Sequence, residues 1–205
     1  AEVPYYDENT SQSLIATFAN RGGMLYNKLL KMSLERSEEN DTLRAGDTLT
    51  YISPARAEIL WPDTLFVTPD GTPQEGSANN ASLVMLLRYG KARFLLAGDA
   101  EHEVEHVLVE RFGDSLKADV YKASHHGSKT SNTAPFLRSI DPEVVVVCVG
   151  EKNKFRHPSS TTMGRFDSLG TTLYRTDRDG AVWIKTNGEK IWGESKLGEK
   201  FDVDI

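Results

Sequence analysis

From Ser82 onward, apolar runs that fit β-strands alternate with segments that fit helices, and this alternation narrows the possible folds more than any other pattern. The expected strands are 82–89, 92–98, 118–124, 143–149 and 172–176, and the expected helices are 101–112, 134–140 and 158–170. Such alternation is typical of right-handed β-α-β crossovers, whose parallel strands deliver the loops that follow them to one edge of the sheet. The sequence therefore predicts an α/β fold with its functional site at that edge.

The two ends of the chain give weaker signals. The further expected elements are a helix over 11–21, strands over 47–52 and 57–61, a loop over 68–80, and a terminal hairpin over 181–186 and 190–192. Nothing divides the chain into two parts, so we expect residues 1–205 to form a single domain or a substantial piece of one.

Composition excludes some classes of protein. Hydrophobic residues make up 39% of the chain and charged residues 26%, and no apolar run approaches the roughly 20 residues that span a bilayer. The net charge of -6 gives no general attraction to nucleic acid, so phosphate binding would need a local cluster of cations or metal ions. The acidic composition therefore argues against a protein that coats DNA, but not against a nuclease.

The run HEVEH matches the zinc-peptidase pattern H-E-x-x-H at His102, Glu103 and His106. On a helix, however, Val104 and Leu108 lie on one apolar stripe, and the two histidines fall on the opposite side. They are interleaved with acidic residues, namely Glu103, Glu105 and Glu110. We therefore expect this face to be exposed to solvent and the match to be coincidental.

Three consecutive strands of the predicted sheet end in residues that can carry chemistry. Asp99 follows 92–98, His125 and His126 follow 118–124, and the loop after 143–149 carries Asn153, Lys154, Arg156 and His157. A carboxylate and an imidazole at neighbouring loop positions can hold a divalent metal ion. Ser128 and Lys129 add a hydroxyl and a cation, which suit a phosphate group. Bland alternatives stay open, because Asp99 also fits a helix N-cap and the Ser/Thr-rich run 128–131 also fits a helix entry.

The stretches that contain LAGD (96–99) and SHHGSKTS (124–131) closely resemble the C-terminal half of the metallo-β-lactamase-like domain of ComEC-type DNA-uptake competence proteins and related free-standing hydrolases. The resemblance runs from about Ile59 to Trp183. It implies an αββα sandwich, of which this chain would supply the C-terminal half with β-α-β crossovers and terminal hairpins. It also places HEVEH on a helix where the family varies, which agrees with an exposed face.

The resemblance also implies roles for individual residues. By their matching positions, Asp99 bridges two divalent ions, Zn or Mn, and His126 binds one of them. His125 contacts the scissile phosphate, and Lys129 or His157 orients or neutralises it, with help from Ser128. The implied activity is that of a phosphodiesterase that degrades DNA during uptake. The implied location is the outer face of the cytoplasmic membrane of a bacterium, beside a channel formed upstream in the same protein, or the cytoplasm for a free-standing hydrolase.

One departure from the family is large. The main metal motif of the superfamily, H-x-H-x-D-H, occurs nowhere in the 205 residues. We therefore expect an inactive fragment of the domain; the alternatives are a non-catalytic module that binds nucleic acid or a partner and, last, a peptidase that uses His102, Glu103 and His106. Half of a sandwich would expose a sheet edge and an apolar face, which predicts a homodimer.

Overall fold

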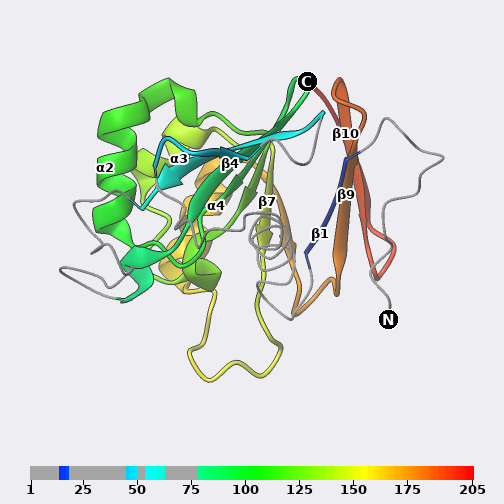
Figure 1. Cartoon of the computed structure of the whole chain (residues 1–205). Coiled ribbons are helices and arrows are strands. Elements are labelled where there is room, and N and C mark those ends of the chain that lie inside the picture. The colour runs from blue at the N-terminus through cyan, green and yellow to red at the C-terminus, as the bar shows by residue number, and fades with distance from the viewer. Residues whose placement is uncertain (1–13, 19–44, 50–53, 63–77) are drawn as a thin grey trace, which may run out of the picture.

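A seven-stranded sheet forms the centre of the computed structural model, which describes residues 14–18, 45–49, 54–62 and 78–205 (Figure 1). Its strands are β2 (Thr48–Leu49), β3 (Arg56–Trp61), β4 (Val84–Tyr89), β5 (Ala92–Leu96), β6 (Val120–Lys122), β7 (Val144–Val147) and β8 (Thr172–Arg175). They lie side by side in chain order, antiparallel from β2 to β5 and parallel from β5 to β8. The predicted α/β class and the parallel crossovers are thereby confirmed.

Three helices connect the parallel strands, and all of them lie on one face of the sheet (Figure 1). They are α2 (His102–Phe112), α3 (Ala134–Ile140) and α4 (Ser160–Leu169), close to the predicted bounds. Val104 and Leu108 of α2 are fully buried together with Phe136 of α3 and Phe166 of α4. This helix-side core holds the crossovers against the sheet.

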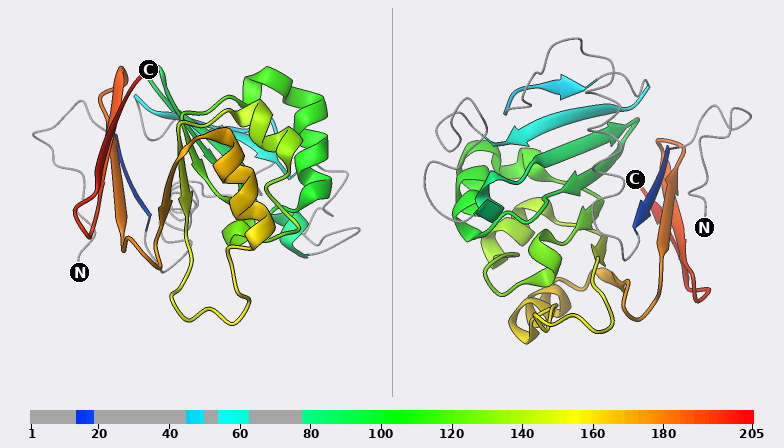
Figure 2. Two further views of the ribbon diagram at one scale, coloured as in Figure 1. Left: turned by 180° about the vertical axis from the view of Figure 1, so that it is seen from behind. Right: turned by 60° about the horizontal axis from the view of Figure 1, so that its bottom comes forward.

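A second sheet covers the opposite face of the first (Figure 2). Its strands, in spatial order, are β1 (Leu14–Phe18), β9 (Val182–Thr186), β10 (Lys190–Ser195) and β11 (Lys200–Asp204), and every neighbouring pair is antiparallel. Ile184 and Ile191 pack between the sheets with Phe94 and Val146. The described residues thus form three layers, helices, sheet and sheet.

The helix predicted over 11–21 is wrong. Residues 14–18 form strand β1, which pairs antiparallel with β9 from Leu14 opposite Thr186 to Phe18 opposite Val182. A short apolar run fits either structure, and here a pairing with a strand far along the chain decides. Of the other weak predictions, 57–61 and the hairpin strands are confirmed, and 47–52 is confirmed at β2. Residues 50–52 and most of the loop 68–80 lie outside the described residues.

The two histidines of HEVEH lie on the exposed side of α2, as predicted. Their side chains are 59% exposed at His102 and 74% at His106, and they face Glu103 and Glu110 respectively. The placement of Glu105 on this exposed face is wrong, because its side chain is fully buried. Its position borders the apolar stripe, and its carboxylate accepts hydrogen bonds from the backbone N–H groups of Asn132 and Thr133.

A buried polar network supports the loop that follows β6. The Tyr121 hydroxyl donates to Asn132 Oδ1 at 2.9 Å, and Asn132 Nδ2 donates to the carbonyl oxygen of Ser124 at 3.0 Å. Ser124 Oγ donates to the carbonyl oxygen of Ala100 at 2.6 Å, which ties this loop to the one after β5. Such groups are tolerated in a protein interior because each finds its partner there. The network therefore fixes the backbone on which the histidines stand.

We predict that Glu105→Ala lowers the free energy of unfolding by at least about 2 kcal/mol, because it leaves one buried and one partly buried backbone N–H without acceptors. Urea denaturation followed by circular dichroism measures the change. His106→Ala is the matched control on the exposed side of the same helix and should stay within about 0.5 kcal/mol of the parent chain. Equal midpoints for the two variants would show that the Glu105 carboxylate does not hold the loop.

Candidate functional site

Three loops meet at the carboxyl ends of β5, β6 and β7, where the sequence predicts the site. They carry Asp99, the 3-10 turn Ser124–Gly127, and His157. The backbone N–H of His125 donates to the carbonyl oxygen of Gly98 at 3.1 Å, and the N–H of Ser159 donates to that of Gly127 at 2.9 Å. Direct hydrogen bonds between main chains therefore join each loop to the next.

Asp99 and His126 face each other across the first two loops. Asp99 Oδ1 lies 3.6 Å from His126 Nε2. His126 Nδ1 lies 2.6 Å from the carbonyl oxygen of Cys148, at the end of β7. Because a carbonyl oxygen can only accept, the neutral ring carries its proton on Nδ1 and turns the Nε2 lone pair toward Asp99.

Asp99 is not the cap of the helix that follows. The N-cap position of α2 is occupied by Glu101, whose side chain makes no capping hydrogen bond. The Glu101 carboxylate instead accepts from Thr130 Oγ1 at 2.9 Å and lies 3.3 Å from His125 Nδ1. The bland alternative for Asp99 is thereby removed, and its carboxylate points to the histidine loop.

Lys122 is a site residue that the sequence analysis missed. Its ammonium lies 4.0 Å from Asp99 Oδ1 and donates to the carbonyl oxygen of Gly98 at 2.9 Å. Burial lowers the pKa of Lys122, and the Asp99 carboxylate opposes that change. The sequence offered one signal for Lys122. It is a charged residue in an otherwise buried strand, two residues before the histidine turn.

His125 and His126 both adopt left-handed backbone conformations, with φ of 44° and 55°. For residues other than glycine this conformation is uncommon and costs on the order of 1 kcal/mol or more. At Gly127, where φ is 79°, an added Cβ would lie 2.6 Å from Pro158 Cβ, so glycine allows the second and third loops to approach. The turn is thus held in a strained shape by its surroundings.

The imidazole of His125 is the least satisfied group of the site. Its side chain is 21% exposed, and Nδ1 is buried without a hydrogen bond among the described residues. Glu101 Oε1 is near enough for an ion pair, but the contact lacks hydrogen-bond geometry. The His125 ring also lies 5.6 Å from that of His157, centroid to centroid. His125 therefore turns Nδ1 into the protein beside the Glu101 carboxylate, and a ligand could reach only its other ring nitrogen.

His157 is positioned by Asn153 within its own loop. The backbone N–H of His157 donates to Asn153 Oδ1 at 2.7 Å, and Asn153 Nδ2 donates to the His157 carbonyl oxygen at 2.9 Å. Burial lowers the pKa of His157, with His125 and His126 acting in the same direction and Asp99 against them. The ring consequently favours its neutral form beside the other two histidines.

The two predicted phosphate ligands, Ser128 and Lys129, differ in their exposure to solvent. Ser128 is 5% exposed, and its hydroxyl lies 3.0 Å from Thr130 Oγ1, so it takes part in the structure of the loop. Lys129 is exposed on the same loop. Their roles at a phosphate stay predictions.

The donor set fits part of a metal centre. Histidines that bind metals commonly donate their second ring N–H to a backbone carbonyl, as His126 does to Cys148. Asp99 supplies a carboxylate next to the free ring nitrogen. Within the described part of the chain, however, no group of three or more His, Cys, Asp or Glu side chains is arranged to hold a metal ion. Asp99 and His126 are therefore candidate ligands, and their metal-binding role stays a prediction.

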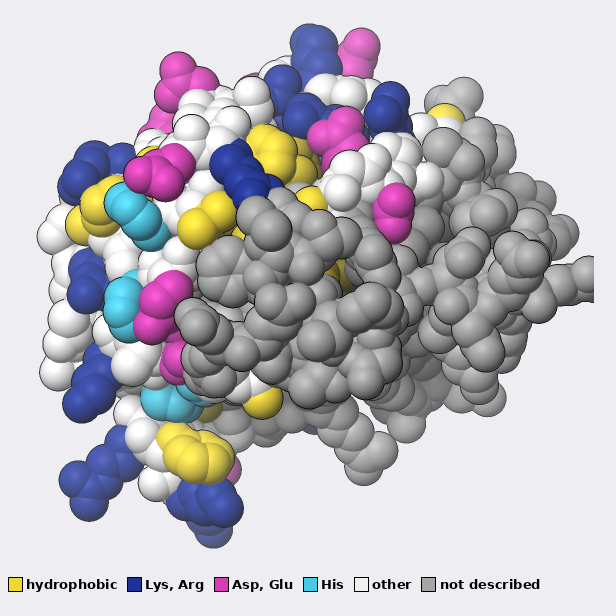
Figure 3. Space-filling model, turned by 60° about the vertical axis from the view of Figure 1, so that its left-hand side comes forward, with side chains coloured by type: hydrophobic (Ala, Val, Ile, Leu, Met, Phe, Trp, Pro, Cys, Tyr) yellow, Lys and Arg dark blue, Asp and Glu magenta, His cyan; other side chains and the backbone are white. Residues whose placement is uncertain are grey.

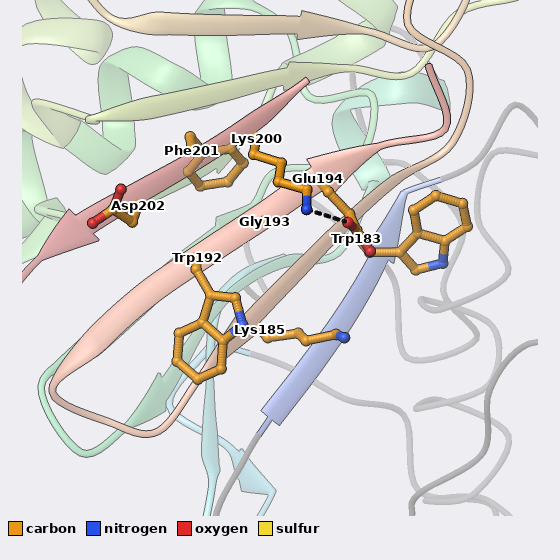
Figure 4. A pocket seen from close by; sticks show the side chains of 8 residues that line it. All are labelled: Trp183, Lys185, Trp192, Gly193, Glu194, Lys200, Phe201 and Asp202. Carbon is orange, nitrogen blue, oxygen red and sulfur yellow. Dashed lines mark ion pairs between the residues drawn. The ribbon is translucent and has the colours of Figure 1, made fainter. Parts of the chain in front are cut away.

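A separate pocket lies on the second sheet and contains none of the predicted site residues (Figure 4). Trp183 and Lys185 of β9 and Trp192 of β10 line it, and Lys200 pairs with Glu194 at 4.0 Å across its floor. Its residues carry no metal-ligand or nucleophile pattern. The chemistry of the described residues is thus concentrated at the ends of β5 to β7.

Residues 62–151 match the family described as the metallo-β-lactamase superfamily, and they include Asp99, His125 and His126. This segment is therefore a metallo-β-lactamase-like sequence, as LAGD and SHHGSKTS predict. The chain is, more particularly, similar to proteins of bacterial competence. ComE operon protein 3 of Bacillus subtilis is 29% identical over 155 residues, which cover 76% of this chain and 19% of the relative.

Two further relatives give the same result. Competence protein ComA of Neisseria gonorrhoeae is 36% identical over 104 residues, or 51% of this chain and 15% of the relative. Recombination protein 2 of Haemophilus influenzae is 34% identical over 106 residues, or 52% of this chain and 13% of the relative. The predicted resemblance to competence proteins is confirmed. The chain spans less than a fifth of the length of these relatives.

We predict that His157 in the metal-free protein titrates below the ordinary histidine pKa of 6.5. The unfolded chain then binds more protons than the folded one as pH falls below that value, so the free energy of unfolding decreases there. The stability contributed by neutral His157 is present above pH 6.5 and is lost as pH falls through the folded pKa. NMR titration of the ring protons in the presence of EDTA measures the midpoint. A midpoint at or above 6.5 would contradict the shift.

Proposed function

We propose that this chain forms part of a metal-dependent phosphodiesterase in which Asp99 and His126 are metal ligands. The observation that carries the proposal is the orientation of His126. Its Nδ1 is held by the Cys148 carbonyl while Nε2 faces Asp99 Oδ1 at 3.6 Å. Carboxylate and imidazole together suit both zinc and manganese, so the donor set does not choose between them.

The other residues of the site act on the phosphate in this proposal. Asp99 and His126 would hold divalent ions, whose positive charge would stabilise the oxygens that attack and leave phosphorus. His125, whose Nδ1 lies 3.3 Å from Glu101 Oε1, orients a phosphate oxygen through its other ring nitrogen, and neutral His157 donates a hydrogen bond beside it. Lys122 adds positive charge behind Asp99, and Lys129 reaches the substrate from the exposed side of the loop.

The biological setting that we propose is DNA uptake. Its support is the similarity to proteins named for competence. The substrate is then DNA, and the domain lies on the outer face of the cytoplasmic membrane beside a channel of the same protein. Among the described residues, no helix is both long enough and apolar enough to cross a bilayer. A second copy of the chain, paired through a sheet edge, is a further proposed partner that light scattering tests.

The two ligands are fewer than a two-metal centre needs, and this observation favours a second candidate. The superfamily motif H-x-H-x-D-H, which the resemblance implies as the source of the other ligands, is absent from the sequence. A chain that binds metal weakly would act as a nucleic-acid or partner-binding module without hydrolysis. The peptidase alternative has no such support, because His102 and His106 are exposed and paired with acidic neighbours.

We predict that Asp99→Ala weakens the binding of Zn²⁺ at least about tenfold, since loss of even a second-shell partner of a metal costs about 10–100-fold. Isothermal titration calorimetry of the EDTA-treated and dialysed chain measures the affinity. Asp114→Ala, which removes an exposed carboxylate from the turn after α2, is the matched control and should bind as the parent chain does.

Hydrolysis of bis(p-nitrophenyl) phosphate in the presence of Zn²⁺ or Mn²⁺ separates the two candidate functions. Activity that Asp99→Ala abolishes and Asp114→Ala leaves intact supports the phosphodiesterase. Metal binding that depends on Asp99 without hydrolysis supports the binding module. Equal zinc affinity in Asp99→Ala and the parent chain would overturn the metal site itself.

A further inference from the structure

The loop between β7 and α4, residues 150–158, projects beyond the end of the sheet (Figures 1 and 2). Asn153 braces it from within, because its side-chain amide bonds to the carbonyl oxygens of Gly150 and His157 and to the N–H of His157. The N–H of Arg156 closes a further turn onto the Asn153 carbonyl oxygen at 3.4 Å. The loop is therefore presented in a defined shape.

The exposed side chains of this loop are basic and aromatic. Lys152, Lys154 and Arg156 are exposed, against a single acidic neighbour, Glu151. Phe155 between them is 69% exposed, one of two large hydrophobic side chains that are exposed among the described residues. In Figure 3, basic side chains surround a hydrophobic one at the lower end of the molecule. The loop thus concentrates positive charge on a chain whose net charge is -6.

Aromatic contacts connect this loop to the candidate site. The Phe155 ring stacks on that of His157 with centroids 5.9 Å apart and an interplanar angle of 17°. The His157 ring in turn lies 5.6 Å from that of His125. Lys154 Nζ lies 5.1 Å from the Phe155 centroid, which keeps a cation at the ring. A group that lies on Phe155 is consequently only two rings away from His125.

We propose that this loop binds an unpaired nucleotide of a nucleic-acid strand, with Phe155 stacked on a base and Lys152, Lys154 and Arg156 at the flanking phosphates. Exposed aromatic rings among basic side chains are the common means of holding single strands without regard to sequence. The inference rests on the proposed phosphodiesterase function. With a base stacked on Phe155, the phosphate next to that base would lie at the His125 and His157 rings. The inference names single-stranded nucleic acid as the substrate class.

The chemistry favours an unpaired strand over a duplex and over a membrane. Inside a duplex both faces of every base are already stacked, so only an unpaired or terminal base can lie on an exposed ring. A membrane surface would attract the same cations, but it requires apolar area that enters the lipid. Here the single Phe155 ring stacks on His157 and has the Lys154 ammonium 5.1 Å from its centroid, so it supplies little apolar area of that kind.

We predict that Phe155→Ala and Phe155→Leu each weaken the binding of a fluorescein-labelled oligothymidylate about tenfold, whereas Phe155→Tyr retains it, because stacking needs an aromatic ring. Fluorescence anisotropy of the full 205-residue chain in EDTA measures the dissociation constants. Leu197→Ala removes the other exposed hydrophobic side chain, at 71% exposure, and should bind as the parent chain does. Circular dichroism confirms that every variant is folded.

The basic residues have a separate signature. Each phosphate contact contributes about 0.7 to the slope of log affinity against log salt for a single strand, so Lys152→Gln combined with Lys154→Gln should reduce the slope by about 1.4. Lys196→Gln, at an exposed lysine in the turn between β10 and β11, should leave the slope unchanged.

Any one of three binding results would overturn this inference. They are equal affinities for Phe155→Ala and Leu197→Ala, binding of a duplex as tight as that of the single strand, and a parent chain that binds anionic vesicles but no strand. Because EDTA removes metal, the binding result does not depend on hydrolysis. Strand binding that requires Phe155, without metal-dependent cleavage of the oligothymidylate, would overturn the phosphodiesterase and keep the loop assignment. Cleavage of the oligothymidylate that Phe155→Ala leaves unchanged would do the reverse.

Discussion

Strands β5, β6 and β7 pair in parallel, and each is buried on both faces, between the helices on one side and the second sheet on the other. Val145 and Val147 pack toward the helices while Val144 and Val146 pack toward the sheet, so β7 cannot slip by one residue without exchanging its two faces. This register places Asp99, the histidine turn and His157 within reach of one another. The distances of the site are thus consequences of core packing.

Polar contacts hold the loops of the site in shape once the sheet has brought them together. The histidine turn adopts a left-handed shape that its own residues disfavour, and it persists because Ser124, Asn132 and Glu105 bind the backbone around it. Glu105 comes from α2 and Asn132 from the loop before α3, whereas Ser124 belongs to the turn itself. The crossover helices therefore do more than cover the sheet, since they carry groups that shape the loops at its edge.

The sequence was sufficient to predict the crossovers because their apolar runs have a clear length and period, and it located Asp99, His125, His126 and His157 because each follows such a run. Predictions from the sequence were wrong or missing where contacts between residues far apart in the chain decide the secondary structure or the burial of a side chain. A run of five residues, 14–18, became a strand only through its pairing with β9. Glu105 and Lys122 were missed since charge normally indicates exposure, and their partners are backbone groups or side chains that no local pattern identifies.

The bond from His126 Nδ1 to the Cys148 carbonyl has a consequence for how such a site tolerates mutation. The acceptor is a main-chain atom, so every amino acid at position 148 would supply it. The tautomer of His126 therefore does not depend on which side chain stands at position 148. It depends on where the carbonyl oxygen of residue 148 lies at the end of β7. A substitution there is chemically silent toward the imidazole, whereas an insertion or deletion in the strand would turn the ring's lone pair away from Asp99.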